Sequence, residues 1–330
     1  MIISRTPLRI SFAGGGTDLP SFYEKHGYGA VFNSSVDKYI YVSVKKHCEL
    51  YPEKIRLNYS ETEQINTLDE IQNPIIRECL RLLEIDDNIY ISTVADAPGF
   101  SGLGSSSTFC VGLLHALHLY KGDNVSRGNL AEEAVHIEIN VLKRPMGKQD
   151  HYAAAYGGMN YIRFDDNGNT SVMPLTTRGN ISEEIFSYIS TYWTGIERNS
   201  ETILAVQDKS NDLNSKVLLQ MRTQALAIYN LAKNRKLGLS ELGESMHEGW
   251  LMKRSLSEKI SNSFISNAYE KALEGGALGG KISGAGGGGF LLLIAPKSKK
   301  SNVDSVMDEL GLVKLPLKPD FEGTDVTSVK

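Results

Sequence analysis

The chain has 330 residues, of which 35 are basic and 39 acidic, and its formal net charge of −4 argues against nucleic acid as a partner. Its 41% apolar content fits a folded protein, and its length suits two domains. The sequence has no apolar run long enough to cross a membrane, no signal-peptide pattern at its start and three widely spaced cysteines. We therefore predict a cytoplasmic protein with reduced thiols and no membrane partner.

The first half of the chain is predicted to contain both strands and helices. The expected strands are 2–12, 30–36, 39–44, 55–59, 88–95 and 159–164, and the expected helices are 74–83, 105–120, 129–142 and 149–155. A tight turn at Asp37-Lys38 is expected to join two of these strands into a hairpin.

The second half is expected to be mostly helical over 182–274. A glycine cluster at 275–289 then leads into a strand at 290–295, a helix near 301–310 and a strand near 312–317, and the last ten residues are expected to be loosely held. Loop signals near 165–185 place a predicted domain boundary between 175 and 176. The expected domains are 1–175 and 176–330, with the active site in the cleft between them.

The stretch PGFSGLGSSS at 98–107 follows a predicted strand and opens a predicted helix. The first turn of a helix has unpaired N–H groups and a partial positive charge, and glycines let a ligand approach the backbone. This context predicts a phosphate site, whereas the simpler alternative is a helix cap made by one serine. The other near-matches to nucleotide motifs, within 275–289, precede a strand and are rejected for that reason.

Two carboxylates stand out in the helices that follow. Glu138 falls on the apolar stripe of 129–142, where an unpaired carboxylate would be costly. It is predicted either to form an internal salt bridge, with Arg9 or Lys148, or to bind Mg²⁺. Asp150 begins the next predicted helix and is interpreted either as a cap or as the group that accepts a proton from an attacking hydroxyl.

Three motifs in this order resemble the GHMP kinase superfamily: TPLRISFAGGGTDLP at 6–20, PGFSGLGSSS at 98–107 and KISGAGGGGF at 281–290. The resemblance covers nearly the whole chain. It implies an α+β fold of two domains, the first like domain 2 of ribosomal protein S5 and the second ferredoxin-like with added helices. It also implies an ATP-dependent kinase that uses Mg²⁺.

The same resemblance implies a role for each matching residue. Asp150 would orient or deprotonate the acceptor hydroxyl, Arg9 would offset charge on the transferred phosphoryl group, and Ser106 (or Ser105) with Glu138 would hold Mg²⁺. The residues implied to bind or support ATP are Gly99, Ser101, Gly102, Gly104, Ser105, Ser106, Ser107 and Gly286. The adenine base would lie in the 45–75 region, near Tyr51, Pro52 or Tyr59.

The first motif indicates the substrate. The form GGGTD at 14–18 resembles the heptose 7-phosphate kinases, which implies transfer to the anomeric hydroxyl of D-glycero-D-manno-heptose 7-phosphate for nucleotide-activated heptose and capsule or other surface glycans. Gly16, Thr17 and Asp18 would contact the sugar, although Asp18 could instead make a local turn. The cations proposed for the sugar phosphate are Lys148, Arg144, Arg163 and Arg198. Fucokinase-like activity and a non-catalytic sensor are the alternatives, and a monomer or homodimer is expected.

Overall fold

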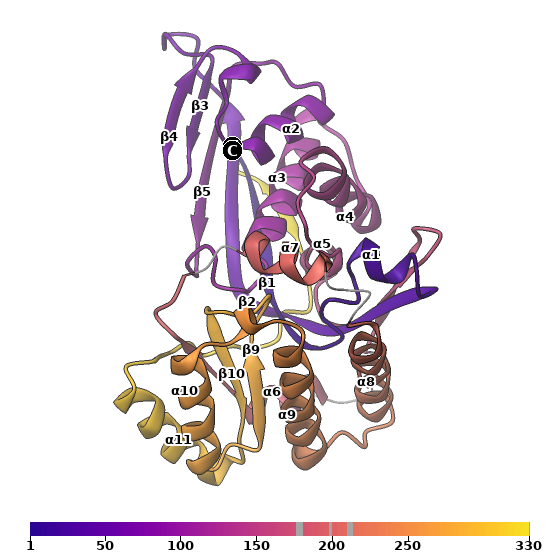
Figure 1. The fold of residues 1–330 in the computed structure, drawn as a ribbon. Coiled ribbons are helices and arrows are strands. Elements are labelled where there is room, and N and C mark those ends of the chain that lie inside the picture. Colours follow the sequence, from indigo (N-terminus) through magenta and orange to yellow (C-terminus); the bar gives the residue numbers. More distant parts are fainter. Residues whose placement is uncertain (176–180, 198–199, 210–213, 330) are drawn as a thin grey trace.

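The computed structural model describes residues 1–329 apart from 176–180, 198–199 and 210–213, and Figure 1 shows two sheets flanked by helices. The larger sheet contains β1 (Ile2–Ala13), β2 (Tyr28–Lys46), β3 (Ile55–Asn58), β4 (Thr62–Ile65), β5 (Ile89–Ala95), β6 (Met159–Asp165), β7 (Thr170–Pro174) and β12 (Asp325–Ser328). Its order is β12-β1-β2-β5-β3-β4, and β6 joins β2 to β7.

Helices of the first half pack around this sheet. They are α1 (Pro20–Tyr23), α2 (Pro74–Leu82), α3 (Ser105–Lys121), α4 (Arg127–Val135) and α5 (Gln149–Tyr156), with short 3₁₀ and π segments at Leu68–Glu70 and His136–Val141. Helix α3 lies on β1 and β2, and α4 lies on α3 and α5. Because α3 is covered on all sides, its almost uniformly apolar sequence fits a buried helix.

The smaller sheet has the order β11-β8-β10-β9, and α9, α10 and α11 contact it, whereas α8 packs against β1, β2 and β6 of the larger sheet. Its strands are β8 (Ile189–Trp193), β9 (Gly279–Ile282), β10 (Phe290–Ile294) and β11 (Val313–Lys314). The helices are α6 (Ile181–Tyr188), α7 (Ser200–Lys209), α8 (Ser215–Lys233), α9 (Leu239–Ser255), α10 (Ser263–Glu274) and α11 (Lys297–Glu309), with a 3₁₀ turn at Glu258–Ile260. The predicted α+β class is confirmed, although β8 lies inside the stretch expected to be mostly helical.

Strand β10 explains why the run FLLLI is entirely apolar. Alternate side chains of a strand point to opposite faces of its sheet. Phe290, Leu292 and Ile294 belong to the core shared with the first half of the chain, whereas Leu291 and Leu293 belong to the core beneath α10 and α11. Both faces of this strand are therefore buried, and alternation of apolar and polar residues is not required.

The hairpin predicted at Asp37-Lys38 is wrong, because β2 continues through these residues as one strand paired with β1. The register shifts there: Leu8 faces Val36, but Pro7 faces Tyr39. The two extra residues form a bulge, which increases local twist without ending the strand. Asp37 is then held from outside the sheet, since its N–H donates to the Lys318 carbonyl at 2.9 Å.

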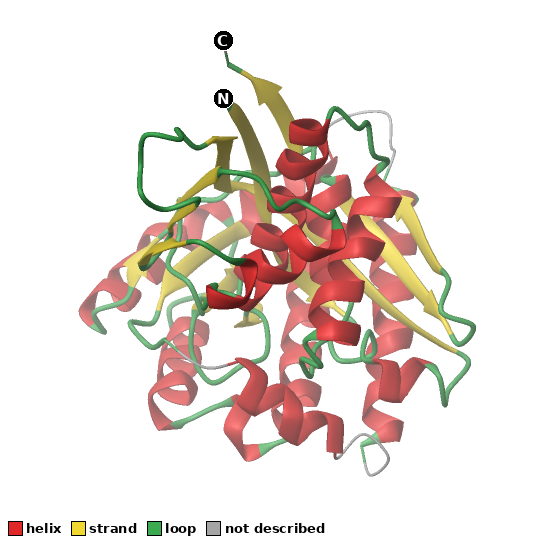
Figure 2. Cartoon of the chain, turned by 90° about the horizontal axis from the view of Figure 1, so that it is seen from above, coloured by secondary structure: helices red, strands yellow, loops and turns green. Residues whose placement is uncertain are grey.

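The carboxy-terminal segment is not loosely held, as had been expected, but returns to the first sheet. Strand β12 pairs antiparallel with β1 from Ile2 to Arg5, and Figure 2 shows the two chain ends side by side on neighbouring strands. The hydroxyls of Thr6 and Thr324 are also hydrogen-bonded at 2.8 Å. The predicted boundary between 175 and 176 borders residues outside the described range and stays a prediction.

Candidate active site

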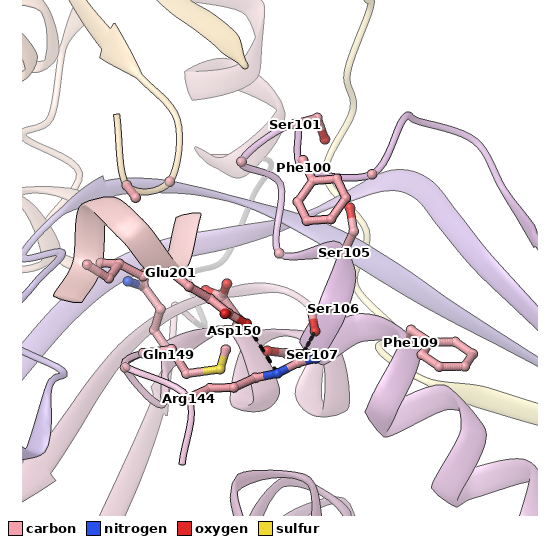
Figure 3. Close-up of a pocket in the computed structure, with 18 of the residues that line it drawn as sticks. Phe100, Ser101, Ser105, Ser106, Ser107, Phe109, Arg144, Gln149, Asp150 and Glu201 are labelled. Carbon is pink, nitrogen blue, oxygen red and sulfur yellow. Dashed lines mark hydrogen bonds and ion pairs between the residues drawn. The ribbon is translucent and has the colours of Figure 1, made fainter. Parts of the chain in front are cut away.

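A cavity of about 430 Å³ brings together segments from both halves of the chain. Its wall contains the loop before α3, the glycine loop after β1, the segment around Asp150, and parts of α7, α9 and the 284–285 turn (Figure 3). The residues that line the cavity include Arg9, Gly16, Asp18, Tyr59, Asn73, Ile75, Gly99, Ser101, Gly102, Gly104, Ser105, Ser106, Ser107, Arg144, Gln149, Asp150, Glu201, Lys253, Gly284 and Ala285.

The loop between β5 and α3 has the backbone geometry of an anion site at the start of the helix. The helix cap is Gly104, with φ of 84° and no capping side chain, so the serine-cap alternative is wrong. The first hydrogen bond of α3 runs from the Thr108 N–H to the Gly104 carbonyl at 3.0 Å, which leaves the preceding N–H groups without helical partners.

Three serine hydroxyls in this loop also lack partners. The Oγ atoms of Ser101, Ser105 and Ser107 are buried and make no hydrogen bond. Buried polar atoms normally have a partner, and phosphate oxygens would supply one. The loop therefore suits the phosphates of a nucleotide in both its backbone and its side chains.

The second half of the chain holds this loop in place. Ser283 Oγ donates to the Gly102 carbonyl at 2.9 Å, and Phe290 N–H donates to the Ser101 carbonyl at 3.2 Å. A Cβ on Gly289 would lie 2.2 Å from that same Ser101 oxygen, so only glycine fits there. Gly286, expected at the nucleotide, packs against Ile260 instead, and its neighbours Gly284 and Ala285 reach the cavity.

Arg9 and Asp150 form a bidentate ion pair beside the loop that precedes α3. Arg9 Nε and Nη2 donate to the two carboxylate oxygens of Asp150 at 2.6 Å each, and Nη1 donates to the Gly102 carbonyl at 2.6 Å. The side chains are 5% and 16% exposed. This pair fixes the Asp150 carboxylate at the cavity wall, and Arg9 is therefore not available to Glu138.

Glu138 is fully buried and sits in a π-helical turn, His136–Val141, that follows α4. The expected salt bridge to Arg9 or Lys148 is wrong, because its partners are Arg144 at 2.7 Å and His151 Nε2 at 2.9 Å. Burial alone would raise the pKa of Glu138, but the hydrogen bond and charge of His151, together with Ser106 and Arg144, lower it to about 2. The carboxylate is thus ionised at neutral pH.

The oxygens of Ser106 and Glu138 fit a magnesium site. Ser106 Oγ donates to Glu138 Oε1 at 2.5 Å, so a hydroxyl that lines the cavity meets a buried carboxylate oxygen. Mg²⁺ uses one or two protein oxygens together with phosphates and waters. No group of three or more histidine, cysteine or acidic residues suited to a metal occurs in the described part of the chain.

Asp18 joins two loops of the cavity wall. Its carboxylate accepts hydrogen bonds from Gly16 N–H at 2.9 Å and Gln149 N–H at 3.3 Å. A Cβ on Gly147 would lie 2.0 Å from Asp18 Oδ2, so the loops approach closely only because that residue is glycine. Burial raises the pKa of Asp18. Thr17 lies behind this contact, where its hydroxyl bonds the carbonyls of Gly14 and Ala30.

The cations expected at the acceptor phosphate lie in different places. Lys148 donates to the Gly168 carbonyl and lies over the Tyr23 ring, outside the cavity wall. Arg163 pairs with Asp165, also outside it. Arg144 reaches the cavity, and Arg198 lies outside the described residues.

Two buried lysines were missed by the sequence reasoning. Lys253 lines the cavity, where its Nζ donates to the Gly284 carbonyl. It follows Met246 and Trp250 on the buried stripe of α9, and this position on an apolar face is a signal that could have identified it. Lys281 on β9 is buried too, and that burial with the nearby Arg9 charge lowers its pKa to about 8.

Part of the 45–75 region, which was predicted to hold the adenine base, lines the cavity. Tyr59 lines it together with Asn73 and Ile75. Tyr51 instead stacks on His47, with ring centroids 4.7 Å apart. Of the two tyrosines considered, Tyr59 alone lines this cavity. Among the described residues, no helix is long and apolar enough to cross a membrane.

Known proteins share the sequence and fold of this chain. A D-glycero-alpha-D-manno-heptose 7-phosphate kinase of Campylobacter jejuni is 28% identical over 95% of each chain. An L-fucokinase/L-fucose-1-P guanylyltransferase of Bacteroides fragilis is 25% identical over 89% of this chain, but over 34% of its own length. The crystal structure of a D-glycero-D-manno-heptose 1-phosphate kinase from Bacteroides thetaiotaomicron has the same fold, with a TM-score of 0.82, full coverage of both chains and 23% identity.

Two family profiles match the chain in order. The N-terminal domain of GHMP kinases matches residues 73–158, which include the phosphate loop, Glu138 and Asp150, and the C-terminal domain matches residues 227–311. Together they span more than half of the chain and contain the residues that form much of the cavity. The chain therefore belongs to the GHMP kinases and is an ATP-dependent phosphotransferase.

Proposed function

We propose that this kinase transfers the γ-phosphoryl group of ATP to the anomeric hydroxyl of D-glycero-D-manno-heptose 7-phosphate and forms the 1,7-bisphosphate. The observation that carries the proposal is that the glycine loop with Asp18 shares one cavity with the phosphate loop and Asp150. The name of the Campylobacter jejuni relative, 28% identical over 95% of the chain, supports this acceptor.

In the proposed reaction Asp150 accepts the proton of the attacking hydroxyl. Its support is its position: the carboxylate lies at the cavity wall, and a Cβ placed on Gly104 of the phosphate loop would be 3.2 Å from Asp150 Oδ2. Arg9 holds both carboxylate oxygens and so orients them. Phosphoryl transfer depends mainly on such positioning and on stabilising charge, and Arg9 would contribute to both.

We assign Mg²⁺ to Ser106 Oγ and Glu138 Oε1, the oxygen pair described above. When bound, the ion would neutralise charge on the nucleotide phosphates. His151 is fully buried and donates to the second oxygen of Glu138, which fixes the carboxylate orientation. The loop from Gly99 to Ser107 would bind the phosphates themselves.

On the acceptor side, Asp18 would receive hydrogen bonds from sugar hydroxyls. A carboxylate has about four lone-pair sites, and two backbone N–H groups use only part of that capacity. Gly16 and Gln149 line the wall next to Asp18. For the acceptor phosphate we propose Lys253, because it is a buried cation that lines this cavity from the second half of the chain.

The test is ADP release from Mg·ATP with five acceptors supplied separately. They are D-glycero-D-manno-heptose 7-phosphate, D-glycero-D-manno-heptose 1-phosphate, unphosphorylated heptose, L-fucose and galactose. We expect turnover of the 7-phosphate at a kcat/KM at least about 100-fold above the other four, because a buried cation penalises an acceptor that lacks its phosphate.

Each other outcome would change a defined part of the proposal. Preference for the heptose 1-phosphate would refute the anomeric hydroxyl as the acceptor atom. Preference for L-fucose would support the fucokinase-like alternative and remove the need for a phosphate receptor. If none of the five were turned over while ATP still bound, the non-catalytic sensor would become the better interpretation.

A further inference from the structure

Arg144 places one guanidinium nitrogen on the oxygen pair assigned to Mg²⁺. Its Nη1 lies 2.7 Å from Ser106 Oγ and 2.7 Å from Glu138 Oε1, and Figure 3 shows the side chain reaching Ser106 across the cavity wall. A guanidinium cannot lose its proton at any ordinary pH. An arriving Mg²⁺ therefore meets a like charge on the two oxygens that it needs.

The same guanidinium also has a second carboxylate within reach. Arg144 Nε is 3.3 Å from Glu201 Oε1 on α7, and Figure 3 shows these two side chains together. The Glu201 side chain is 52% exposed, whereas Glu138 is fully buried. The exposed Glu201 side chain can move together with the Arg144 guanidinium, whereas the buried Glu138 side chain cannot.

The backbone near Arg144 is fixed, so movement would be confined to the side chain. The Arg144 N–H donates to the Glu138 carbonyl at 3.0 Å, Lys143 has φ of 54°, and Pro145 follows. The side chain itself is 21% exposed and faces the cavity. A rotation of the side chain would thus carry the guanidinium from the metal oxygens toward the space before the phosphate loop.

We propose that Arg144 is an exchange cation of the metal site: it neutralises Glu138 while Mg²⁺ is absent, and moves onto the nucleotide phosphate oxygens when Mg²⁺ enters. A buried carboxylate without a counter-charge is costly, so one cation or the other must be present. Phosphate oxygens accept bidentate hydrogen bonds from arginine, as carboxylates do. The proposal rests on the metal ligands assigned under the proposed function.

This exchange makes metal and nucleotide binding interdependent. Without a nucleotide, Mg²⁺ must displace the Arg144 guanidinium, which then has only solvent or the Glu201 carboxylate as a partner. With a nucleotide, the displaced guanidinium gains phosphate oxygens. Each ligand therefore strengthens the binding of the other, as linkage requires.

The test measures Mn²⁺ binding to the full chain without nucleotide, from the electron paramagnetic resonance signal of free Mn²⁺. We expect Arg144→Gln to bind Mn²⁺ about tenfold or more tightly than the wild type, because the competing charge is removed. Arg144→Lys, which keeps a charge, should remain near the wild type. The matched control is Arg81→Gln, since Arg81 also pairs with two carboxylates but lies outside the cavity wall.

A second measurement identifies the site and the other half of the exchange. Adding Glu138→Gln to Arg144→Gln should abolish the tight Mn²⁺ binding, and Mg·ATP should bind Arg144→Gln about tenfold more weakly by fluorescence of a labelled ATP. Unchanged Mn²⁺ affinity in Arg144→Gln would overturn the proposal, as would a gain that persists without the Glu138 charge. None of these measurements uses the sugar, so a wrong acceptor would not affect them.

Discussion

Replacing Asp150 with asparagine removes one charge while keeping the size and shape of the side chain. In the wild type, Arg9 donates to both Asp150 oxygens at 2.6 Å. Taking one partner from a buried ion pair costs about 3 to 5 kcal/mol of unfolding free energy. Here the asparagine keeps one acceptor oxygen and Arg9 keeps the Gly102 carbonyl at 2.6 Å, so we expect a smaller loss of about 2 kcal/mol.

The effect on catalysis should be much larger than the effect on stability. A positioned general base contributes roughly 10²- to 10⁴-fold, so Asp150→Asn should lower kcat by at least about 100-fold. ATP affinity should change less than about threefold, because the serine hydroxyls and N–H groups of the phosphate loop are untouched. Three assays separate these effects: ADP release, titration with ATP, and urea unfolding.

The matched control is Asp165→Asn, because Asp165 also pairs with an arginine, at 2.7 Å, but lies outside the cavity wall. It should leave kcat and ATP affinity unchanged. If Asp150→Asn loses the expected stability yet keeps kcat within about tenfold of the wild type, Asp150 is a structural partner of Arg9 and not the base. If neither stability nor turnover falls, both the buried pair and the catalytic assignment are refuted.

Three further changes test other parts of the site. Gly104→Ala should weaken ATP binding about tenfold in a titration, because φ is 84° and the new Cβ would lie 3.2 Å from Asp150 Oδ2; unchanged affinity would contradict the loop assignment. Lys253→Met should raise KM for a phosphorylated acceptor about tenfold or more but not KM for ATP, and equal changes would argue against its proposed role. Lys281 has a pKa of about 8 against 10.5 in the unfolded chain, so the unfolded state binds more protons between these values and wild-type stability should rise with pH there. Lys281→Met should therefore add about 3 kcal/mol of unfolding free energy at pH 7, fading by about pH 10.5; a gain that does not vary with pH in urea unfolding would refute this.

The phosphate loop could be predicted from the sequence because all of its determinants are local. Strand, glycines and helix start follow each other between Ile89 and Ser107, and the free N–H groups of α3 result from helix geometry alone. The family motifs then indicated which carboxylates belong to the same site as the phosphate loop. In the structure, Asp150 and the serines line one cavity, and Glu138 is hydrogen-bonded to Ser106 at its wall.

Long-range pairing could not be predicted in the same way. The segment at Asp37 has the composition of a turn, but β1 pairs with β2 on both sides of it and keeps the chain extended. The last residues are polar, yet an unpaired edge of β1 accepts them as β12. In both places, hydrogen bonds to a distant strand outweigh local preference.

The buried charges show the limit of pattern reasoning most directly. Helical spacing places Glu138 on the apolar stripe of its helix, and the same argument would have found Lys253 on α9. Spacing cannot choose the partner, because the π-helical turn after α4 changes where Glu138 points. Arg9 or Lys148 was the expected partner. Asp150 instead binds Arg9 through two oxygens, Lys148 donates to the Gly168 carbonyl, and Glu138 pairs with Arg144, six residues away, and with His151. Because Arg144 sits on the two oxygens proposed to bind Mg²⁺, the ion pair that makes burial of Glu138 tolerable is the one that Mg²⁺ would have to displace.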